Sequence, residues 1–407
     1  MAEKFSVGVI GLGGRGMGHL DGILTERDDV TVSAVCDVYE DRIRAAQEKC
    51  KSKKGWDVYG TTDYRDLIEN GGADVIFVFS AWENHVPAAL YAMRHRKQVA
   101  IEVGGAYSLD DCFELVRAHE ETGIHCMMLE NCCYDRYEMM VMRMVREGVF
   151  GTLVHCEGGY RHDLRHEITY GRENRHYRLR NYKSRCSENY PTHELGPIAR
   201  LIGINRGNRM VSLVSVSSKA RGFADYVERH LDTINPHRVG EVIKQGDIVT
   251  TLITCENGET ITLRLDTSLP RFYNREFTVR GTRGMYEMGN NMVYFDGMEE
   301  WFDTLRNYTT YQNNAVEYEE KYLPEAWRRM TEEGLKSGHG GMDGVEFRAF
   351  FEALRAGGEM PIDVYDMAAW MSITYLSEQS VLRGGAPQQI PDFTRGKYKT
   401  RPLRDVL

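Results

Sequence analysis

A glycine pattern close to the N-terminus constrains how the first third of this chain folds. The apolar run at residues 7–10 leads directly into residues 11–16, which have the spacing G-x-G-x-x-G. Gly11 permits a tight turn, Gly13 lets a pyrophosphate approach the backbone, and Gly16 lets a helix pack closely on the preceding strand. The pattern therefore predicts a strand, a turn and a helix whose free N–H groups bind a diphosphate.

An acidic residue in register with these glycines favours NAD as the bound dinucleotide. A second apolar run, residues 30–36, ends at Asp37, which lies 21 residues after Gly16. A carboxylate at this place accepts hydrogen bonds from ribose hydroxyls and repels a 2′-phosphate. Gly14 and Arg15 lie in the same turn. Because Arg15 is basic, it could bind a 2′-phosphate, so NADP stays possible as the cofactor. A glycine turn with a purely structural role is the alternative.

The first third of the chain alternates strands with helices. Strands are expected at 74–80, 98–102 and 125–129, and helices at about 14–27, 41–51, 63–70, 86–96 and 109–122. This alternation predicts an α/β fold, a Rossmann-type doubly wound parallel sheet that binds ligands at the carboxyl ends of its strands. Further residues expected at those ends are Trp82, Glu83, Asn84, His85, Glu102, Val103 and Asn131. We therefore expect residues 1–132 to form an NAD-binding domain.

The pattern changes after residue 132. Strands dominate at 153–160, 210–218, 247–255, 260–267 and 277–281, with helices at 136–147, 342–356 and 364–382. Asn257-Gly258 is a hairpin signal between two of the strands. Residues 161–190 form a polar stretch that is expected to be a functional loop. Residues 133–407 are thus predicted to form a C-terminal α+β domain with a large, mainly antiparallel sheet.

The end of the polar stretch contains the sharpest candidate for chemistry, Tyr190-Pro191-Thr192-His193. A helix is expected to begin here, and the positive end of a helix favours neutral, proton-accepting imidazole in its first turn. His193 is therefore a candidate general base, although a packed histidine at a helix start is the alternative. Residues 338–343 are read as a turn and helix N-cap.

Three further residues are candidates for a sugar-binding site. Tyr160 is expected at a strand end, Arg178 in the polar stretch and Tyr273 at another strand end. Arginine and tyrosine donate hydrogen bonds to hydroxyl or acetamido groups. Each residue taken singly is also compatible with an ordinary surface or core position.

Composition excludes several classes of partner. The net charge is −9 without a basic block, which argues against nucleic acid or an anionic membrane. No apolar run approaches the roughly 20 residues that cross a bilayer, and the N-terminus leaves no room for a signal peptide. The nine cysteines show neither disulfide spacing nor a C-x-x-C pair. We expect free thiols in the cytoplasm and no metal site.

Several long motifs resemble one family of enzymes. They lie at residues 11–16, 82–87, 102–103, 126–134, 190–193, 338–343 and 390–396. The chain resembles the NAD-dependent family 109 glycoside hydrolases, known for α-N-acetylgalactosaminidase activity, which share the Gfo/Idh/MocA fold. The resemblance covers nearly the whole chain and implies a homo-oligomer acting on a small glycoside.

The resemblance also assigns roles at the matching positions. It implies NAD contacts from Gly14, Arg15, Asp37, Trp82, Glu83, Asn84, His85, Glu102, Val103, Asn131 and Tyr190. It implies sugar contacts from Tyr160, Arg178, Tyr190, Pro191, Thr192, His193 and Tyr273. Bound NAD⁺ would remove hydride from sugar C3, His193 or Tyr190 would remove the C2 proton, and the glycosidic oxygen would leave. Water would then add and the hydride would return.

The chain departs from the family pattern beside the expected sugar site. The family usually has Lys-Arg-Asn-Gly-Asn-Leu where this chain has residues 184–189, and a glycine where this chain has Glu194. Gly104 stands where proline is usual, and Val103 stands where related sugar dehydrogenases carry a proton-transferring lysine. The specificity for anomer, sugar and aglycone therefore stays open.

Two other functions remain as alternatives at this point. The first is a net NAD-dependent oxidoreductase acting on a sugar or inositol, and Val103 argues against its usual mechanism. The second is a non-catalytic sugar or dinucleotide sensor on the same fold, and Tyr190 with His193 argues against it.

Overall fold

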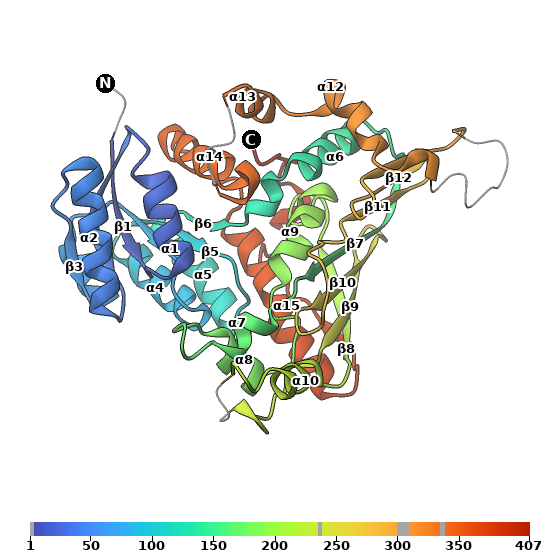
Figure 1. Cartoon of the computed structure of the whole chain (residues 1–407). Helices are drawn as coiled ribbons and strands as arrows, with labels where there is room; N and C mark the ends of the chain where they lie inside the picture. Colours follow the sequence, from blue (N-terminus) through green and yellow to red (C-terminus); the bar gives the residue numbers. More distant parts are fainter. Residues whose placement is uncertain (1–3, 235–237, 299–308, 334–337) are drawn as a thin grey trace. The chain divides into compact units, whose positions relative to one another are not determined.

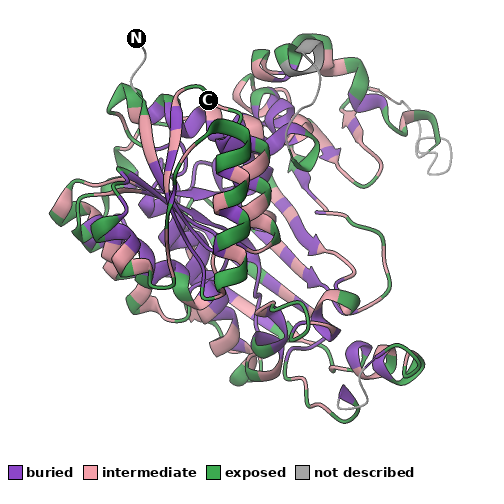
Figure 2. Cartoon of the chain, turned by 60° about the vertical axis from the view of Figure 1, so that its left-hand side comes forward, coloured by how far each residue is buried: buried purple, intermediate pink, exposed green. Residues whose placement is uncertain are grey.

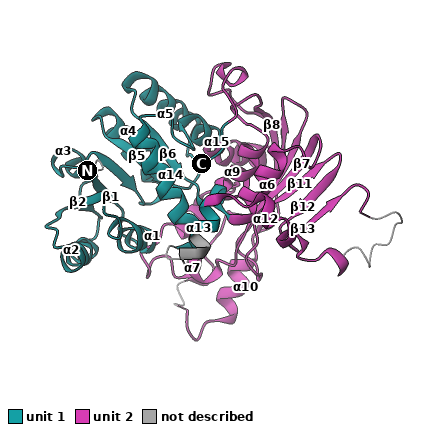
Figure 3. Cartoon of the chain, turned by 90° about the horizontal axis from the view of Figure 1, so that it is seen from above, with its two compact units in different colours: residues 1–135, 326–369, 404–407 teal, residues 136–325, 370–403 magenta. Residues whose placement is uncertain are grey.

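The computed structural model describes residues 4–234, 238–298, 309–333 and 338–407. Two compact units make up the chain (Figure 3). Unit 1 comprises residues 1–135, 326–369 and 404–407, and unit 2 comprises residues 136–325 and 370–403.

Unit 1 is built on a parallel sheet of six strands (Figure 1). They are β1 (Phe5–Ile10), β2 (Val30–Cys36), β3 (Tyr59–Thr61), β4 (Val75–Val78), β5 (Gln98–Glu102) and β6 (Cys126–Leu129). Their order is β3-β2-β1-β4-β5-β6, which confirms the doubly wound sheet and puts the reversal of strand order between β1 and β4. Every residue of β4 is buried, because helices cover both faces (Figure 2).

Side-chain caps mark the start of two helices of this unit, one at Asp63 and one at Ser108. Helices of this unit include α1 (Gly14–His19), α2 (Glu40–Lys54), α3 (Tyr64–Asn70), α4 (Trp82–Arg94), α5 (Leu109–Thr122) and α14 (Met342–Ala356), and a π-helical turn (Leu20–Leu24) follows α1. Ser108 and Asp111 form a reciprocal capping box at the start of α5, as their spacing predicts. Phe347 of α14 stacks on Phe77, with ring centroids 5.4 Å apart, so α14 packs against the sheet.

Helix α4 begins four residues earlier than the sequence predicts. It starts at Trp82 rather than near Val86, with Pro87 inside its early turns. A proline costs least near a helix start, where few N–H groups have intrahelical partners, so its presence favours a later start than the one observed. The candidate residues at positions 82–85 consequently form the first turn of a helix and not a loop.

Unit 2 contains a mixed sheet of eight strands. They are β7 (Leu153–Arg161), β8 (Met210–Ser217), β9 (Ile248–Cys255), β10 (Thr260–Asp266), β11 (Thr278–Gly281), β12 (Gly284–Glu287), β13 (Met292–Phe295) and β14 (Gln388–Gln389). The order is β13-β12-β11-β7-β10-β9-β8-β14, and β7 pairs with β10 in parallel while the other pairs are antiparallel. The predicted mainly antiparallel sheet is confirmed, and Asn257-Gly258 turns β9 into β10 with Gly258 at φ +100°.

Helices of unit 2 include α6 (Arg136–Arg146), α7 (Arg165–Thr169), α8 (Arg178–Ser184), α9 (Pro191–Leu201), α10 (Gly222–Arg229) and α12 (Glu319–Tyr322). Two more, α13 (Glu325–Glu333) and α15 (Val364–Leu382), contribute residues to both units. None of the described helices is long and apolar enough to cross a membrane. The prediction of a loop over residues 161–190 is wrong in part, because this stretch contains the short helices α7 and α8. Its polar composition shows no apolar periodicity that would have predicted them.

The two faces of the eight-stranded sheet differ. Helix α9 packs on β7 and β10, where Cys156 and Leu263 are buried, and Ile253 of the neighbouring β9 is buried as well. The opposite face exposes Val216 and Leu252. This arrangement follows the alternation of side chains along each strand.

We expect a methyl group at position 158 to destabilise unit 2. A Cβ on Gly158 of β7 would lie 2.2 Å from the carbonyl oxygen of Glu194 in α9, whereas a Cβ on Gly358 meets no atom within 4 Å. Because the clash is with backbone, Gly158→Ala should cost about 2–3 kcal/mol of unfolding free energy. Thermal unfolding compared with Gly358→Ala checks this, and equal melting temperatures would contradict the close packing.

Candidate functional site

The glycine turn after β1 combines tight packing with an open stretch of backbone. Gly11 has φ +92°, and a Cβ there would lie 2.5 Å from the Ser80 nitrogen. A Cβ on Gly16 would lie 1.9 Å from the Gly11 carbonyl oxygen. By contrast, a Cβ on Gly13 meets nothing closer than 3.7 Å and one on Gly14 meets nothing within 4 Å. The outer glycines thus close the turn, and the middle ones leave the space that a diphosphate requires.

Asp37 is held beside this turn by the backbone. Its Oδ2 accepts a hydrogen bond from the Leu12 N–H at 2.7 Å, and its Oδ1 accepts one from the Tyr39 N–H at 3.1 Å. The carboxyl group is buried, and Arg42 lies 3.5 Å from Oδ2. Each oxygen keeps a second lone pair, so the oriented carboxylate can accept hydrogen bonds from ribose hydroxyls. These residues fit NAD.

Arg15 is clamped between two carboxylates of unit 1. Its Nε donates to Glu102, and its Nη1 and Nη2 donate to Asp343 at 2.7 and 3.2 Å. Burial alone would lower the pKa of Arg15, but the charges of Glu102 and Asp343 outweigh burial and raise that pKa. Because its charge is paired in this way, Arg15 is poorly placed to bind a 2′-phosphate.

The two carboxylates are correspondingly stabilised as anions. Burial would raise the pKa of Glu102, but the Arg15 charge holds this pKa below its usual range. The pKa of Asp343 is also low, because hydrogen bonds from His339 and Arg15 outweigh burial. Asn131, at the end of β6, donates from Nδ2 to Asp343 at 2.8 Å. Glu102, Arg15, Asp343 and Asn131 therefore form one connected network at the carboxyl end of the sheet.

The end of β5 presents no ionisable side chain beyond Glu102. Val103 is buried, and its N–H donates to Glu102 Oε2 at 2.9 Å. Next to it, a Cβ on Gly104 would lie 2.6 Å from Trp82 Cδ1, so the Trp82 ring covers this position. His85 in the same helical turn is buried, which lowers its pKa, and its Nε2 lies 2.9 Å from the Ser80 carbonyl oxygen. Glu83 and Asn84 complete this turn.

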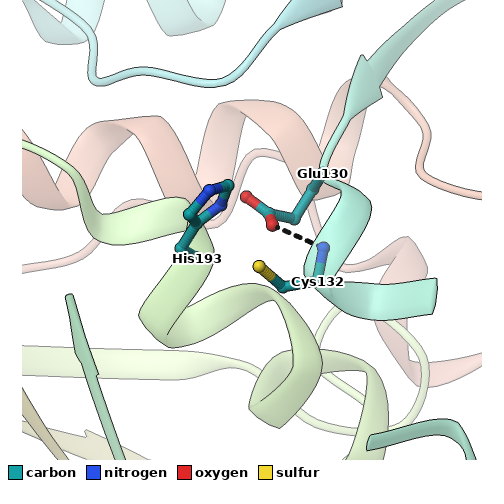
Figure 4. Close-up of side chains that lie close together, drawn as sticks. All are labelled: Glu130, Cys132 and His193. Atoms are coloured by element: carbon teal, nitrogen blue, oxygen red, sulfur yellow. Dashed lines mark hydrogen bonds between the residues drawn. The ribbon is translucent and has the colours of Figure 1, made fainter. Parts of the chain in front are cut away.

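The end of β6 carries a buried carboxylate that sequence reasoning missed. Glu130 is fully buried, and its Oε1 accepts a hydrogen bond from the Cys132 N–H at 3.1 Å (Figure 4). Glu130 thereby caps the turn Asn131–Tyr134 and fixes the residue after it, Asn131. His193, drawn in the same figure, belongs to the first turn of α9 in unit 2.

Three candidate residues meet at the start of α9 within unit 2. The ring centroids of Tyr160 and Tyr190 are 4.3 Å apart, and His193 lies 4.8 Å from Tyr190 and 5.5 Å from Tyr160. Pro191 occupies the first turn of α9, where a proline is favoured, and His193 follows two residues later. His193 is partly exposed while both tyrosines are buried. The expected position of His193 in the first turn is confirmed.

Arg178 lies across the two tyrosines. Its Cζ is 4.9 Å from the Tyr190 centroid and 5.9 Å from the Tyr160 centroid, and its Nε lies 2.7 Å from Glu167 Oε1. Arg178 is buried at the first residue of α8. The burial of Arg178 would lower its pKa, but electrostatic attraction to neighbouring side chains, Tyr160 first among them and Glu167 included, raises that pKa well above the usual value. A permanent cation thus lies against the tyrosine rings.

The other three predicted sugar contacts are Tyr273, Pro191 and Thr192. Tyr273 is 47% exposed, and its ring centroid lies 6.4 Å from that of Tyr160. It belongs to the segment between β10 and β11 and not to a strand end as predicted. Its neighbour Asn274 makes only an isolated bridge with Arg161, so the chain is too irregular for a strand there. Pro191 and Thr192 are buried, so they shape the turn around His193.

Asp343 belongs to the Arg15 network, although the sequence pattern did not predict this pairing. Residues 338–343 form the predicted turn and helix start: the cap of α14 is Gly341, at φ +107°, and Asp343 lies in the first turn. There its carboxylate serves Arg15 and Asn131. The only sequence signal for this role was an acidic residue after a glycine-rich turn. Its partners, Arg15 and Asn131, are too distant in sequence to be predicted from it.

Comparisons with known proteins match two parts of the chain to two family models. Residues 5–130 match the family described as an oxidoreductase family with an NAD-binding Rossmann fold. Residues 134–400 match the family described as the C-terminal domain of glycosyl hydrolase 109. Together the two matches span nearly all of the chain.

Relatives and solved structures cover almost the full length as well. A glycosyl hydrolase family 109 protein from Solibacter usitatus is 38% identical over 97% of this chain and 89% of its own. An α-N-acetylgalactosaminidase from Tannerella forsythia is 35% identical over 96% and 86% respectively. The structure of scyllo-inositol dehydrogenase from Lactobacillus casei with bound NAD(H) and scyllo-inositol shares the fold, with a TM-score of 0.65 at 13% identity over 95% of this chain and 99% of that one. This chain belongs to glycosyl hydrolase family 109 and is an NAD-dependent glycosidase.

Proposed function

We propose that this enzyme cleaves N-acetylgalactosaminides or closely related glycosides by an oxidation–elimination–addition–reduction cycle with tightly retained NAD. The observation that carries the proposal is the cluster of Tyr160, Tyr190 and His193 at the start of α9, with Arg178 against the rings. The cluster offers hydrogen-bond donors for a sugar together with an acid/base residue. The name of the Tannerella forsythia relative supports the choice of sugar.

Each residue has a distinct task in this scheme. When bound, NAD⁺ accepts a hydride from sugar C3 and later returns it, so no net oxidation occurs. Tyr160, Arg178 and Tyr273 bind the sugar hydroxyl or acetamido groups, and Pro191 and Thr192 hold the turn. His193 removes the proton at C2, which a ketone at C3 acidifies, and Tyr190 is the second candidate for this step. The Arg178 charge beside Tyr190 would stabilise a phenolate.

The cofactor contacts follow from the geometry of unit 1. We propose that residues 11–16 bind the diphosphate, that Asp37 binds the ribose, and that Trp82, Glu83, Asn84, His85, Glu102, Val103, Asn131 and Tyr190 complete the NAD site. Residues 1–132 would act as the NAD-binding domain and residues 133–407 as the substrate domain.

The nine cysteines form no disulfide, and eight are buried, which supports a cytoplasmic location.

We expect the enzyme to prefer NAD⁺ to NADP⁺, and Asp37→Ala to narrow this preference. Loss of charge-assisted hydrogen bonds to the ribose should weaken NAD⁺ binding about tenfold or more. Calorimetry with both dinucleotides provides the measurement, and Asp57→Ala, which changes an exposed carboxylate, serves as the control. Equal affinity of the wild type for the two cofactors would refute the role of Asp37.

Activity should depend on NAD⁺ and on His193. Enzyme from which the cofactor has been removed should cleave p-nitrophenyl α-N-acetylgalactosaminide only after NAD⁺ is added back. The reaction should then release p-nitrophenol without net accumulation of NADH. His193→Ala should lower turnover by about 10²–10⁴-fold and leave NAD⁺ binding intact. His155→Ala alters a histidine on β7 outside the tyrosine cluster and serves as the control.

The possible contrary results separate the alternatives. Accumulation of NADH with a free sugar or inositol would favour a net oxidoreductase. Near wild-type turnover in His193→Ala would make His193 structural and pass the C2 base to Tyr190. Binding of sugar and NAD⁺ with no turnover of any substrate would favour a sensor.

We also propose a homo-oligomer, with a dimer as the simplest form. The exposed Val216 and Leu252 on the open face of the eight-stranded sheet support this, because exposed apolar side chains favour contact with a partner. Light scattering at micromolar concentration should give at least twice the mass of 46.7 kDa. A monomer under these conditions would rule out the proposal.

A further inference from the structure

Two buried glutamates bracket the residues to which we assign acid/base chemistry. Glu188 lies two residues before Tyr190, and Glu194 directly follows His193. Both side chains are at most 1% exposed. No described group donates a hydrogen bond to any of their four carboxyl oxygens, and no described lysine, arginine or histidine forms an ion pair with either group.

The backbone around this pair is firmly anchored. The Glu188 N–H donates to Ser377 Oγ at 2.9 Å, and Thr374 Oγ1 donates to the Glu188 carbonyl oxygen at 2.8 Å. On the other side, the Glu194 carbonyl approaches Gly158 so closely that a Cβ there would lie 2.2 Å away. The turn from 188 to 194 is therefore held by α15 at one end and by β7 at the other.

The two carboxyl groups are neighbours, and each affects the pKa of the other. Burial raises the pKa of Glu188 and also that of Glu194, where the charge of Glu188 adds to the effect. Two ionised carboxylates offer only acceptors and repel each other, so they cannot remain in contact in a buried site. Backbone amides near the pair, those of Tyr160 and Arg264 beside Glu194 and those of Leu265 and Tyr190 beside Glu188, lower the pKa of each carboxyl, but burial outweighs them.

We propose that Glu188 and Glu194 share one proton in a carboxyl–carboxylate hydrogen bond that positions Tyr190 and His193. The bond closes the turn between the two glutamates, so the His193 ring is held against Tyr190 and Tyr160. The two glutamates are positioning residues, since neither reaches the sugar in this scheme. Their catalytic consequence rests on the proposed function, whereas the shared proton does not.

Infrared spectroscopy tests the shared proton without any substrate. Near neutral pH the carbonyl band of protonated carboxyl groups should contain a component that changes in position or intensity in both Glu188→Gln and Glu194→Gln, because each replacement removes one half of the bond. Glu346 is another buried carboxyl with a raised pKa, caused by burial. Glu346→Gln is therefore the control, and it should leave the component of the pair unchanged. A band insensitive to either single replacement of the pair would overturn the proposal.

Kinetics test the positioning role. Gln at either position keeps the volume and can donate an amide N–H to the remaining carboxylate, so kcat and KM should stay within about threefold of the wild type. Leu at either position removes the hydrogen bond, and kcat should fall by about 10²-fold while KM changes little, because a misplaced base slows the step it catalyses. NAD⁺ binding shows whether each Leu variant is folded.

The outcomes remain distinguishable from a failure of the proposed function. If the Leu variants fold and keep wild-type kcat, or if the Gln variants lose as much as the Leu variants, the positioning role is wrong. If a Leu variant does not fold, the Gln variants and the infrared band still decide. If the wild type cleaves no glycoside, the proposed function fails, yet the infrared comparison still tests the shared proton.

Discussion

The close contact between α9 and β7 determines the geometry of the candidate sugar site. Gly158 has no side chain, so the backbone of Glu194 can approach the strand closely. This approach brings the first turn of α9, with His193, against Tyr160 at the end of β7. Tyr190 and Arg178 then complete the cluster from the segment before α9 and from α8. An ordinary side chain at position 158 would move all of these contacts at once.

Charge pairing plays the corresponding part in unit 1. The half-buried Arg15 and the buried Glu102 and Asp343 are stable together because each ion has an opposite partner with directed hydrogen bonds, whereas a lone buried ion costs several kcal/mol. The network also connects the glycine turn to β5 and α14. It leaves Asp37 as the carboxylate beside the open glycines, which agrees with a preference for a dinucleotide without a 2′-phosphate.

Local patterns predicted much of this fold, and contacts between distant residues account for most of what they missed. The glycine turn, the parallel order of unit 1 and the bounds of α14 and α15 follow from residues near each other in sequence. The short strands β3 and β14 escaped prediction because two or three residues contain no periodicity, and neighbouring strands hold them in place.

The site shows the same limit. The residues Tyr190 and His193 stood out because a helix start and a motif mark them, and the resemblance to family 109 supplied their roles. The pairing of Asn131 with Asp343, 212 residues apart, has no local signature. Glu194 and the segment that contains Glu188 stood out only as departures from the family pattern, and the burial of both glutamates is visible only in the structure.

The central claim is that glycoside cleavage proceeds through proton removal at C2 by a residue of the tyrosine–histidine cluster, with NAD regenerated in each cycle. Mass spectrometry or proton NMR of the sugar released in deuterium oxide tests this claim most directly. The account predicts solvent deuterium at C2 of the product. A product without deuterium at C2 would contradict the elimination mechanism, whichever residue serves as the base.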